Sequence, residues 1–252
     1  MNKHWFRNYK LLNLDEIDST NSEAIRLAKT GIMGNHIILA KRQTSGRGRN
    51  NKYWHSCDGN LYFSLLLDID AQTSNEPQLS IVTGLAVYET IKFVAKKSFA
   101  KLDCKLKWPN DILIGDKKLS GILLESINVI TNKPKLQKKY LIIGVGINVI
   151  TNPTDIHREC TNLLKEGIII KDLQQLLFIF MNYFEKYFIK WHDADFSSIR
   201  KSWLEKAYKL NHPVIIDKIS GTFVGIDFAG RLNVKLESGK VLTLSEAEVI
   251  YK

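Results

Sequence analysis

A run of short apolar segments between residues 102 and 149 places the strongest constraint on the fold of this chain. The segments cover residues 102–107, 112–115, 118–127 and 140–149. Turn residues separate them, including Pro109-Asn110-Asp111. Segments joined by such short turns pair most readily as antiparallel strands, so this part of the chain is predicted to build a β-sheet. Two more strands are expected earlier, at 37–41 and 60–70.

Four segments have the pattern of helices that could cover this sheet. The first follows Asp18, where Ser19-Thr20-Asn21 offers oxygens that accept the free backbone N–H groups of a helix start. This helix is predicted to run from Ser19 to Thr30 and to stop at Gly31. Apolar residues at helical spacing predict the others at 79–96, 171–192 and 196–206. The expected fold class is therefore α+β.

The composition changes after Tyr208. Short alternating apolar segments bounded by glycines follow, which is the pattern of a small β-barrel. The predicted domains are therefore residues 1–207 and 208–252. After Tyr208, six Lys or Arg against five Asp or Glu leave a charge of +1, so +9 of the net +10 belongs to the first domain.

The net charge and the cysteines limit the partners and the compartment. A charge of +10 favours acidic partners such as nucleotides, nucleic acid or an acidic protein. The three cysteines, Cys57, Cys104 and Cys160, are too far apart in sequence for a zinc ribbon or a redox dithiol, and so sparse a set fits a reducing compartment. Residues 1–14 lack the pattern of a signal peptide, and no apolar run is long enough to cross a bilayer. A cytoplasmic protein without membrane contact is expected.

The loop Gln43-Thr44-Ser45-Gly46-Arg47-Gly48-Arg49 combines two glycines with two arginines. Glycine lets the backbone approach a ligand closely, and the planar guanidinium groups suit phosphate or carboxylate. This combination fits a site for a phosphorylated or carboxylated small molecule. A solvated basic turn would have the same composition, so the loop leaves both interpretations open.

Three further segments combine polar residues or glycines with strand ends. They are Lys107-Trp108-Pro109-Asn110-Asp111, Lys118-Leu119-Ser120-Gly121-Ile122-Leu123-Leu124-Glu125 and Gly144-Val145-Gly146-Ile147-Asn148. Each could line a pocket, since polar groups orient a ligand and glycine permits its close approach. Taken singly, each also has a structural explanation, namely a turn, an edge lysine and a β-bulge.

In their order and spacing, these segments resemble the biotin protein ligases. The resemblance rests on Ser19-Thr20-Asn21, QTSGRGR at 43–49, KWPND at 107–111, KLSGILLE at 118–125 and GVGIN at 144–148. It covers residues 14–150 by motif and the terminal β-module by architecture. The family fold is a mixed β-sheet packed with helices, followed by a small SH3-like β-barrel. Eighteen residues precede Ser19, too few for the winged helix-turn-helix of bifunctional members, so a monofunctional ligase without specific DNA binding is expected.

The resemblance implies ATP-dependent biotinylation through biotinyl-5'-AMP. The acceptor would be a lysine of a biotin carboxyl carrier protein, as in acetyl-CoA carboxylase. Mg²⁺ is expected with ATP, at a metal site that the sequence does not locate, and a homodimer is possible.

The resemblance also assigns residues to roles. Lys118, Arg47 and Arg49 are the expected catalytic residues, because cations must bring the biotin carboxylate and the α-phosphate together. The expected biotin-binding residues are Ser19, Thr20, Asn21, Gln43, Gly46, Arg47, Gly48, Arg49, Lys118, Gly121 and Gly146. The expected ATP-binding residues are Arg47, Arg49, Trp54, Lys107, Asn110, Asp111, Lys118 and Asn148.

One segment departs from the family pattern. Family members often continue the loop with another glycine and a basic pair before the tryptophan, whereas this chain has Asn50-Asn51-Lys52-Tyr53-Trp54. Asn51 can adopt the left-handed conformation, and Lys52 keeps a charge without the bidentate fork of arginine. Loop closure is therefore expected to differ in detail.

Two alternative functions remain open from the sequence. A lipoate or octanoate ligase would share the catalytic fold and also modify a carrier lysine. A nucleic-acid-binding module would fit the net charge and the terminal barrel, although that barrel is almost neutral and has few aromatic residues.

Overall fold

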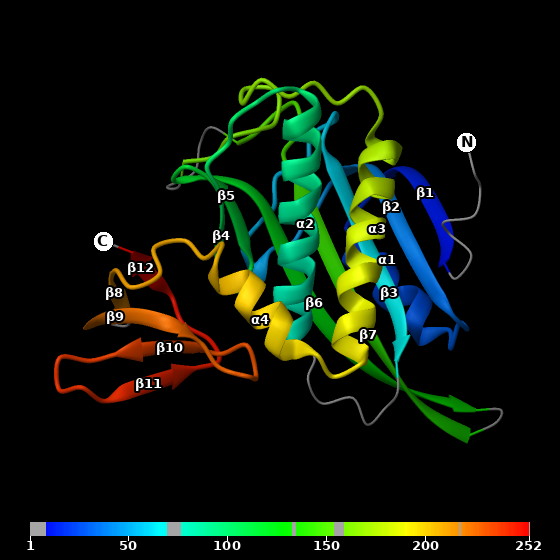
Figure 1. Ribbon diagram of the computed structural model, residues 1–252. Coiled ribbons are helices and arrows are strands. Elements are labelled where there is room, and N and C mark those ends of the chain that lie inside the picture. Colours follow the sequence, from blue (N-terminus) through cyan, green and yellow to red (C-terminus); the bar gives the residue numbers. More distant parts are fainter. Residues whose placement is uncertain (1–8, 70–76, 133–134, 154–158, 217, 252) are drawn as a thin grey trace.

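The computed structural model describes residues 9–69, 77–132, 135–153, 159–216 and 218–251, and its larger part is a seven-stranded sheet. The strands are β1 (Tyr9–Ile17), β2 (Asn35–Gln43), β3 (Leu61–Ile69), β4 (Cys104–Lys107), β5 (Asp111–Ile114), β6 (Lys117–Asn132) and β7 (Lys135–Ile147). Their order is β1-β2-β3-β7-β6-β5-β4 (Figure 1). β1 and β2 pair in parallel and all other neighbours are antiparallel, so the sheet is mixed, as expected.

The sequence prediction missed one strand and shortened a hairpin. β1 carries charged residues at Lys10, Asp15 and Glu16, and none of its residues is fully buried, which suits an edge strand but hides the apolar signal. The hairpin of β6 and β7 reaches residues 132 and 135, beyond the predicted ends at 127 and 140. Within the described residues, β3 pairs with β7 only as far as Lys139, and beyond it the two strands of the hairpin pair only with each other.

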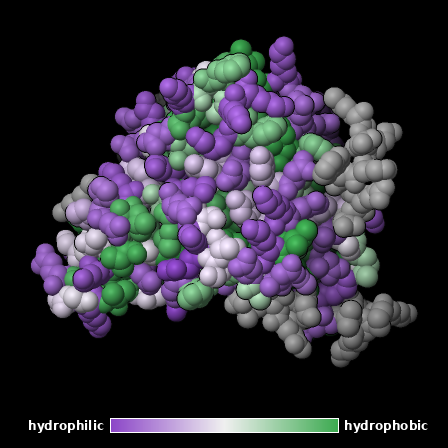
Figure 2. Space-filling model, viewed as in Figure 1, coloured by the Kyte–Doolittle hydropathy of each residue, from purple (hydrophilic) through white to green (hydrophobic). Residues whose placement is uncertain are grey.

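The described residues form four α-helices close to the predicted positions, and the first three of them cover the sheet. They are α1 (Thr20–Lys29), α2 (Gln78–Lys97), α3 (Leu173–His192) and α4 (Phe196–Leu204). Figure 1 shows α2 and α3 side by side on one face. Their outward sides are mainly hydrophilic (Figure 2), as expected for helices that bury one face. Within the described residues, no helix has the length and apolar character needed to span a membrane.

Alternation along the strands divides the core into two layers. Successive strand residues point to opposite faces, so Leu65 and Ile143 pack with α2 and α3, whereas Leu66 and Ile142 pack with α1. Phe180 of α3 lies against Phe63 of β3, with ring centroids 4.9 Å apart. The face under α2 and α3 is continuously apolar. The opposite face is covered by the ten-residue α1 alone among the helices of the described chain, so part of it is left open.

A second, five-stranded antiparallel sheet follows α4, in agreement with the predicted terminal β-module. Its strands are β8 (Pro213–Ile216), β9 (Ile219–Ile226), β10 (Leu232–Lys235), β11 (Val241–Leu244) and β12 (Val249–Tyr251), in the order β11-β10-β9-β8-β12. The domain boundary at residue 208 stays a prediction.

Hydrogen bonds from the first domain hold the turn that precedes β10. Trp108 Nε1 donates to the Gly230 carbonyl at 3.0 Å, and Gln78 Nε2 donates to the Phe228 carbonyl at 2.6 Å. Trp108 is 3% exposed, so its N–H has no access to bulk water and depends on this partner. Trp108 of the KWPND segment is thereby a contact between the two sheets.

Asn60 fixes the chain where it leaves β7. Its Oδ1 accepts from the backbone N–H groups of Val149, Ile150 and Thr151 at 2.8, 2.9 and 3.1 Å, and its Nδ2 donates to the Thr151 carbonyl at 3.0 Å. A buried amide that satisfies three backbone donors holds the bend in one conformation. The bend in turn positions Asn148, the last residue of the GVGIN segment.

We expect Phe180→Ala to lower the free energy of unfolding by about 3–5 kcal/mol, because it opens a cavity between α3 and β3. The matched control is Phe99→Ala, since the Phe99 side chain is 95% exposed. Urea unfolding followed by circular dichroism measures both. Equal stability of the two variants would contradict the packing described for Phe180.

Candidate active site

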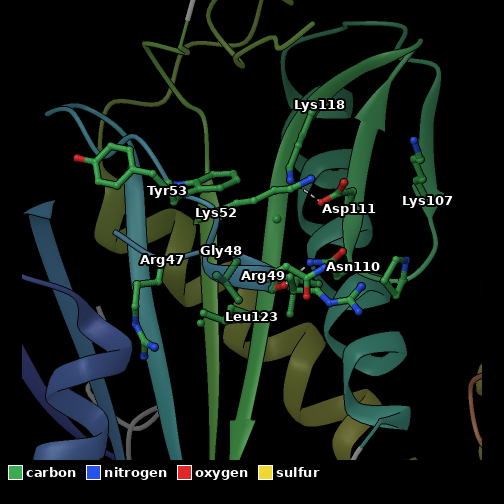
Figure 3. Close-up of a pocket in the computed structure, with 18 of the residues that line it drawn as sticks. Arg47, Gly48, Arg49, Lys52, Tyr53, Lys107, Asn110, Asp111, Lys118 and Leu123 are labelled. Carbon is green, nitrogen blue, oxygen red and sulfur yellow. Dashed lines mark hydrogen bonds and ion pairs between the residues drawn. The ribbon is translucent and has the colours of Figure 1, made fainter. Parts of the chain in front are cut away.

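A pocket of about 950 Å³ opens on the uncovered part of the sheet (Figure 3). The start of α1, the 43–54 loop, the 107–111 turn and residues 247–251 of the second sheet surround it. The predicted substrate residues that line it are Ser19, Thr20, Asn21, Gln43, Arg47, Gly48, Arg49, Trp54, Lys107, Asn110, Asp111, Lys118, Gly121, Gly146 and Asn148. Gly46 lies just behind this lining, where a Cβ atom would come within 2.4 Å of the Trp54 carbonyl oxygen.

Glycines form the floor of the pocket on β6 and β7. Gly121 and Gly146 are paired across the two strands, and the Trp54 ring lies on them. A Cβ atom on Gly146 would stand 2.6 Å from the indole, and one on Gly144 would stand 2.2 Å from Asn21 Oδ1. Side chains at these positions would therefore displace the pocket walls, which explains why the strands carry glycine here.

The start of α1 is held against the loop by charge and hydrogen bonds. Ser19 is the N-cap residue and its side chain accepts from the Ser22 N–H, as predicted from the sequence. Hydrogen bonds from Arg26 lower the pKa of Asp18 to about 2, so this carboxylate stays ionised beside the Ser19 N–H. The Ser45 N–H donates to the Asp18 carbonyl at 2.8 Å, which joins the loop to the helix start.

Four side-chain oxygens, which we call the oxygen cluster, meet at one end of the pocket. They belong to Thr20, Asn21, Gln43 and Ser64. Ser64 Oγ lies 2.5 Å from Asn21 Oδ1 and 2.7 Å from Thr20 Oγ1, and Thr20 Oγ1 lies 3.1 Å from Gln43 Oε1. The amide nitrogens point outward from the cluster, since Asn21 Nδ2 donates to Glu125 and Gln43 Nε2 donates to Ser56.

The oxygen cluster has fewer protons than oxygen–oxygen contacts. Ser64 and Thr20 each carry one hydroxyl proton, whereas the cluster makes three such contacts. One contact therefore has no hydroxyl proton of its own. Oxygen lone pairs therefore remain that no proton of the cluster fills, and a ligand N–H group could donate to them, so the cluster is chemically matched to a neutral polar ring with N–H donors.

The other end of the pocket, which we call the cationic end, carries Lys118, Arg49 and Lys107. Lys118 Nζ lies 2.6 Å from Asp111 Oδ1, and their side chains are only 19% and 10% exposed. Figure 3 shows these two side chains pointing toward each other. Lys118 Nζ also lies 5.1 Å from the centre of the Trp54 ring, and Lys107 Nζ lies 4.9 Å from that of Tyr251. The cationic end is suited to a carboxylate or phosphate.

The two loop arginines point in different directions. Arg49 lies near Asn110, whereas Arg47 is directed to the opposite side of the pocket (Figure 3). Arg47 Nη2 donates to Glu125 Oε2 at 2.8 Å. Arg49 faces the second sheet, with Nη2 3.6 Å from Glu246 Oε1. The sequence assigns both arginines to biotin and to ATP; in the structure Arg47 shares the Glu125 carboxylate with Asn21 of the oxygen cluster.

Polar atoms with unused hydrogen-bonding capacity also face this region. Trp54 Nε1 and Asn148 Oδ1 are buried and have no hydrogen-bond partner within the described part of the chain. Asn148 Nδ2 donates to the Thr161 carbonyl at 3.0 Å, so the free oxygen is held in place. The Asn110 amide donates to the Ile122 carbonyl at 2.6 Å and thus holds the turn between β4 and β5 against β6.

The loop that departs from the family pattern still closes on itself. The Gly48 N–H donates to the Lys52 carbonyl at 2.7 Å, and the Trp54 N–H donates to the Gly46 carbonyl at 2.9 Å. The expectation placed left-handed geometry at Asn51; the structure shows it at Asn50, with φ 54° and ψ 39°. Lys52 Nζ lies 3.6 Å from Glu248 Oε1, so its charge faces the second sheet.

Several residues of the site were not expected from the sequence. Ser56, Ser64 and Glu125 complete the polar network, and residues 247–251 line the pocket. Ser64 interrupts the buried apolar segment 61–67, which is a usable signal for a functional polar residue. Residues 247–251 carry no comparable local signal. Within the described residues, no group of three or more His, Cys, Asp or Glu side chains is arranged as a metal site.

Comparison with known families assigns both parts of the chain. Residues 15–148 match the Biotin/lipoate A/B protein ligase family, and residues 216–251 match the Biotin protein ligase C terminal domain. The biotin–[acetyl-CoA-carboxylase] ligase of Paracoccus denitrificans is 30% identical over 254 residues, covering 94% of this chain and 99% of the relative. The bifunctional ligase/repressor of Bacillus subtilis is 31% identical over 238 residues, covering 91% of this chain and 70% of that protein.

Solved structures agree with these matches. The biotin protein ligase from Aquifex aeolicus in complex with biotin and ATP is similar with a TM-score of 0.78 and 30% sequence identity, covering 96% of this chain and 98% of that one. The family match spans more than half of this chain, and the relatives match it along nearly its whole length. The chain therefore belongs to the biotin/lipoate A/B protein ligase family and is similar throughout to its biotin protein ligase members.

Proposed function

We propose that this protein attaches biotin to a lysine of a biotin carboxyl carrier protein in two steps that consume ATP. The observation that carries the proposal is the pairing of a proton-poor oxygen cluster with a cationic end across one pocket. Biotin has the matching shape, because a ureido ring with two N–H donors lies at one end and a carboxylate at the other.

Each part of biotin has a suitable partner. The ureido N–H groups would donate to the oxygen cluster, which supplies acceptors in excess of protons. The thiophene ring and the valeryl chain would lie beside Leu123 and the Trp54 ring, which covers the glycine floor. The carboxylate would then reach Lys118 at the cationic end, where the amine can hold it beside an incoming phosphate.

In the first step a biotin carboxylate oxygen attacks the α-phosphorus of ATP. The bond from the α-phosphorus to the bridging oxygen of pyrophosphate breaks, and biotinyl-5'-AMP forms. Two anions must approach each other, so Lys118 and Arg49 would act by neutralising their repulsion and by orienting them. The residues proposed on the nucleotide side are Trp54, Asn110, Asp111, Asn148 and Lys107.

In the second step the neutral amine of the carrier lysine attacks the carbonyl carbon of the mixed anhydride. An amide forms, AMP leaves with the electron pair of the broken C–O bond, and the amine gives up a proton. Water would compete as the nucleophile, so the loop that carries Arg49 and Trp54 would have to cover the anhydride.

We propose that Mg²⁺ enters with ATP. Mg²⁺ is usually held by substrate phosphates, waters and one or two protein oxygens, and it neutralises phosphate charge when bound. Asn148 Oδ1, which is buried and has no hydrogen-bond partner among the described residues, and the Asp111 carboxylate are the oxygen donors that fit this role at the nucleotide side.

The proposals for the acceptor protein and the compartment rest on the relatives and on the cysteines of this chain. The Paracoccus relative is named for acetyl-CoA carboxylase, and we propose the carrier domain of that enzyme as the acceptor here. We propose the cytoplasm as the compartment, since ATP is available there and no disulfide joins Cys57, Cys104 and Cys160. The possible homodimer stays a prediction, which analytical ultracentrifugation tests.

Lipoate or octanoate ligation is the alternative, because the family model of residues 15–148 includes those enzymes. A dithiolane ring or an alkyl chain has no N–H group to donate to the oxygen cluster, and residues 216–251 match a biotin protein ligase domain. The same match disfavours the nucleic-acid-binding alternative.

The purified chain, incubated with Mg-ATP and an apo carrier domain, is expected to add biotin but not lipoate to the carrier. Intact mass spectrometry measures the product, and omission of ATP is the control. Addition of lipoate in place of biotin would contradict the substrate assignment but would still agree with the two-step chemistry. Biotin-dependent exchange between ATP and pyrophosphate reports the first step without the carrier, and its absence would refute the proposal.

Lys118→Gln is expected to slow the biotin-dependent exchange of ATP with pyrophosphate by about 100- to 1000-fold, because a single electrostatic donor to the transition state is lost. Lys117→Gln is the matched control, since Lys117 is adjacent on β6 and exposed. Circular dichroism verifies that both variants fold. Wild-type exchange in Lys118→Gln would rule out a catalytic role for this lysine.

Arg49→Gly is expected to release more free biotinyl-5'-AMP per turnover, because the loop loses its charged anchor over the anhydride. Arg42→Gly serves as control, since Arg42 makes a half-exposed ion pair with Glu16 outside the pocket. Chromatography of the reaction mixture measures the adenylate. If Arg49→Gly releases no more of it than the control, Arg49 does not retain the intermediate.

A further inference from the structure

We propose that Glu125 is a specificity-determining residue: it keeps the oxygen cluster short of protons and so selects ligands that bring their own N–H groups. The inference rests on the proposed function, because it assigns a reason for the choice of a ureido ring at that site. It concerns the carboxylate behind the pocket wall, away from the cationic end where bonds form and break.

The Glu125 side chain extends from the sheet and contacts both α1 and the 43–54 loop. It lies on β6 opposite Ile142 of β7, on the same face as Gly121 and Leu123. A single oxygen, Oε2, accepts from Asn21 Nδ2 at 2.7 Å and from Arg47 Nη2 at 2.8 Å. The side chain is 25% exposed, so these two bonds are only partly screened by water.

The carboxylate decides which way the Asn21 amide faces. An ionised carboxylate beside a guanidinium can only accept hydrogen bonds, so Asn21 must present its NH₂ group to Glu125. The Asn21 oxygen is then turned toward Ser64, whose Oγ lies 2.5 Å away. With the amide held in this orientation, Ser64 must donate its one hydroxyl proton to the Asn21 oxygen.

At the other end of the oxygen cluster, the orientation of the Gln43 amide is also fixed. The backbone N–H of Thr20 donates to Gln43 Oε1 at 2.8 Å, and Gln43 Nε2 donates to Ser56 Oγ at 2.8 Å. Neither amide can therefore turn an N–H group into the cluster without losing a bond. The shortage of protons is thus imposed from outside the cluster, and Glu125 imposes it at the Asn21 end.

A neutral side chain at position 125 would relax this constraint. Glutamine has nearly the same shape but can donate as well as accept, so the Asn21 amide could turn over and donate to Ser64. The cluster would then have as many protons as contacts. A ligand N–H group would lose the Asn21 oxygen as an acceptor, and the preference for a ureido ring would weaken.

The test compares Glu125→Gln with wild type for two ligands, biotin and a biotin methylated on a ureido nitrogen, each by titration calorimetry. Wild type is expected to favour biotin strongly. In Glu125→Gln the preference should fall about tenfold, mainly through weaker biotin binding, which is the factor for one hydrogen bond between neutral groups. Steric effects of the methyl group are common to both proteins and cancel in the comparison.

Two further variants separate this role from a structural one. Glu16→Gln makes the same chemical change in the half-exposed ion pair with Arg42, and it should leave the preference at the wild-type value. Glu125→Asp keeps an acceptor-only group and should keep more of the preference than Glu125→Gln. The KM for ATP should stay within about twofold of wild type in all three variants, since the nucleotide side is not altered.

The outcomes are distinguishable. An unchanged preference in Glu125→Gln, or equal losses in Glu125→Gln and Glu125→Asp, would overturn the role of Glu125 while biotinylation by the wild type stands. If the wild type fails to bind biotin, the proposed function itself is refuted.

Discussion

The uneven covering of the central sheet is the constraint on which the rest of this structure depends. One face is buried under α2 and α3, and the residues that alternate toward it are continuously apolar. The other face is covered by α1, a helix of only ten residues. Where α1 begins, its polar N-terminal residues lie over β3, β6 and β7, and beyond them the strands carry glycine. The pocket exists because a short helix cannot bury a whole sheet face, and because glycine keeps the remaining surface open.

The two ends of the pocket offer different kinds of interaction to a ligand. At the cationic end, Lys118 and Asp111 form a largely buried ion pair, so an incoming anion meets a positive charge that is already held in place. At the other end the interactions are neutral, and their direction is set by groups with only one possible hydrogen-bonding role: a carboxylate at Glu125 and a backbone N–H at Thr20. Trp54 lies between them on the glycine floor. An elongated molecule with a neutral ring and an anionic tail is matched to both ends.

The second sheet completes the pocket. Hydrogen bonds from Trp108 and Gln78 fasten the turn before β10, which brings residues 247–251 to the mouth. Glu246 and Glu248 thereby come within 3.6 Å of Arg49 and Lys52 of the loop. Phosphate groups would compete with these carboxylates for the same cations, since exposed ion pairs are weak. Trp108 lines the pocket, as the sequence suggested, and it also holds the two sheets together.

The sequence by itself determined the elements and the chemistry of most of the site. Caps, apolar spacing and turn residues located the four helices and most strands, because these signals act over a few neighbouring residues. The motifs likewise named residues that the fold brings to one pocket. Only the tertiary structure decided the place of β1, whose polar residues suit an edge. It also decided the separation of Arg47 from Arg49 and the hydrogen-bond network through Ser64 and Glu125. Asn21 and Glu125 are 104 positions apart, and their contact depends on how a helix packs on a sheet, which no local pattern records.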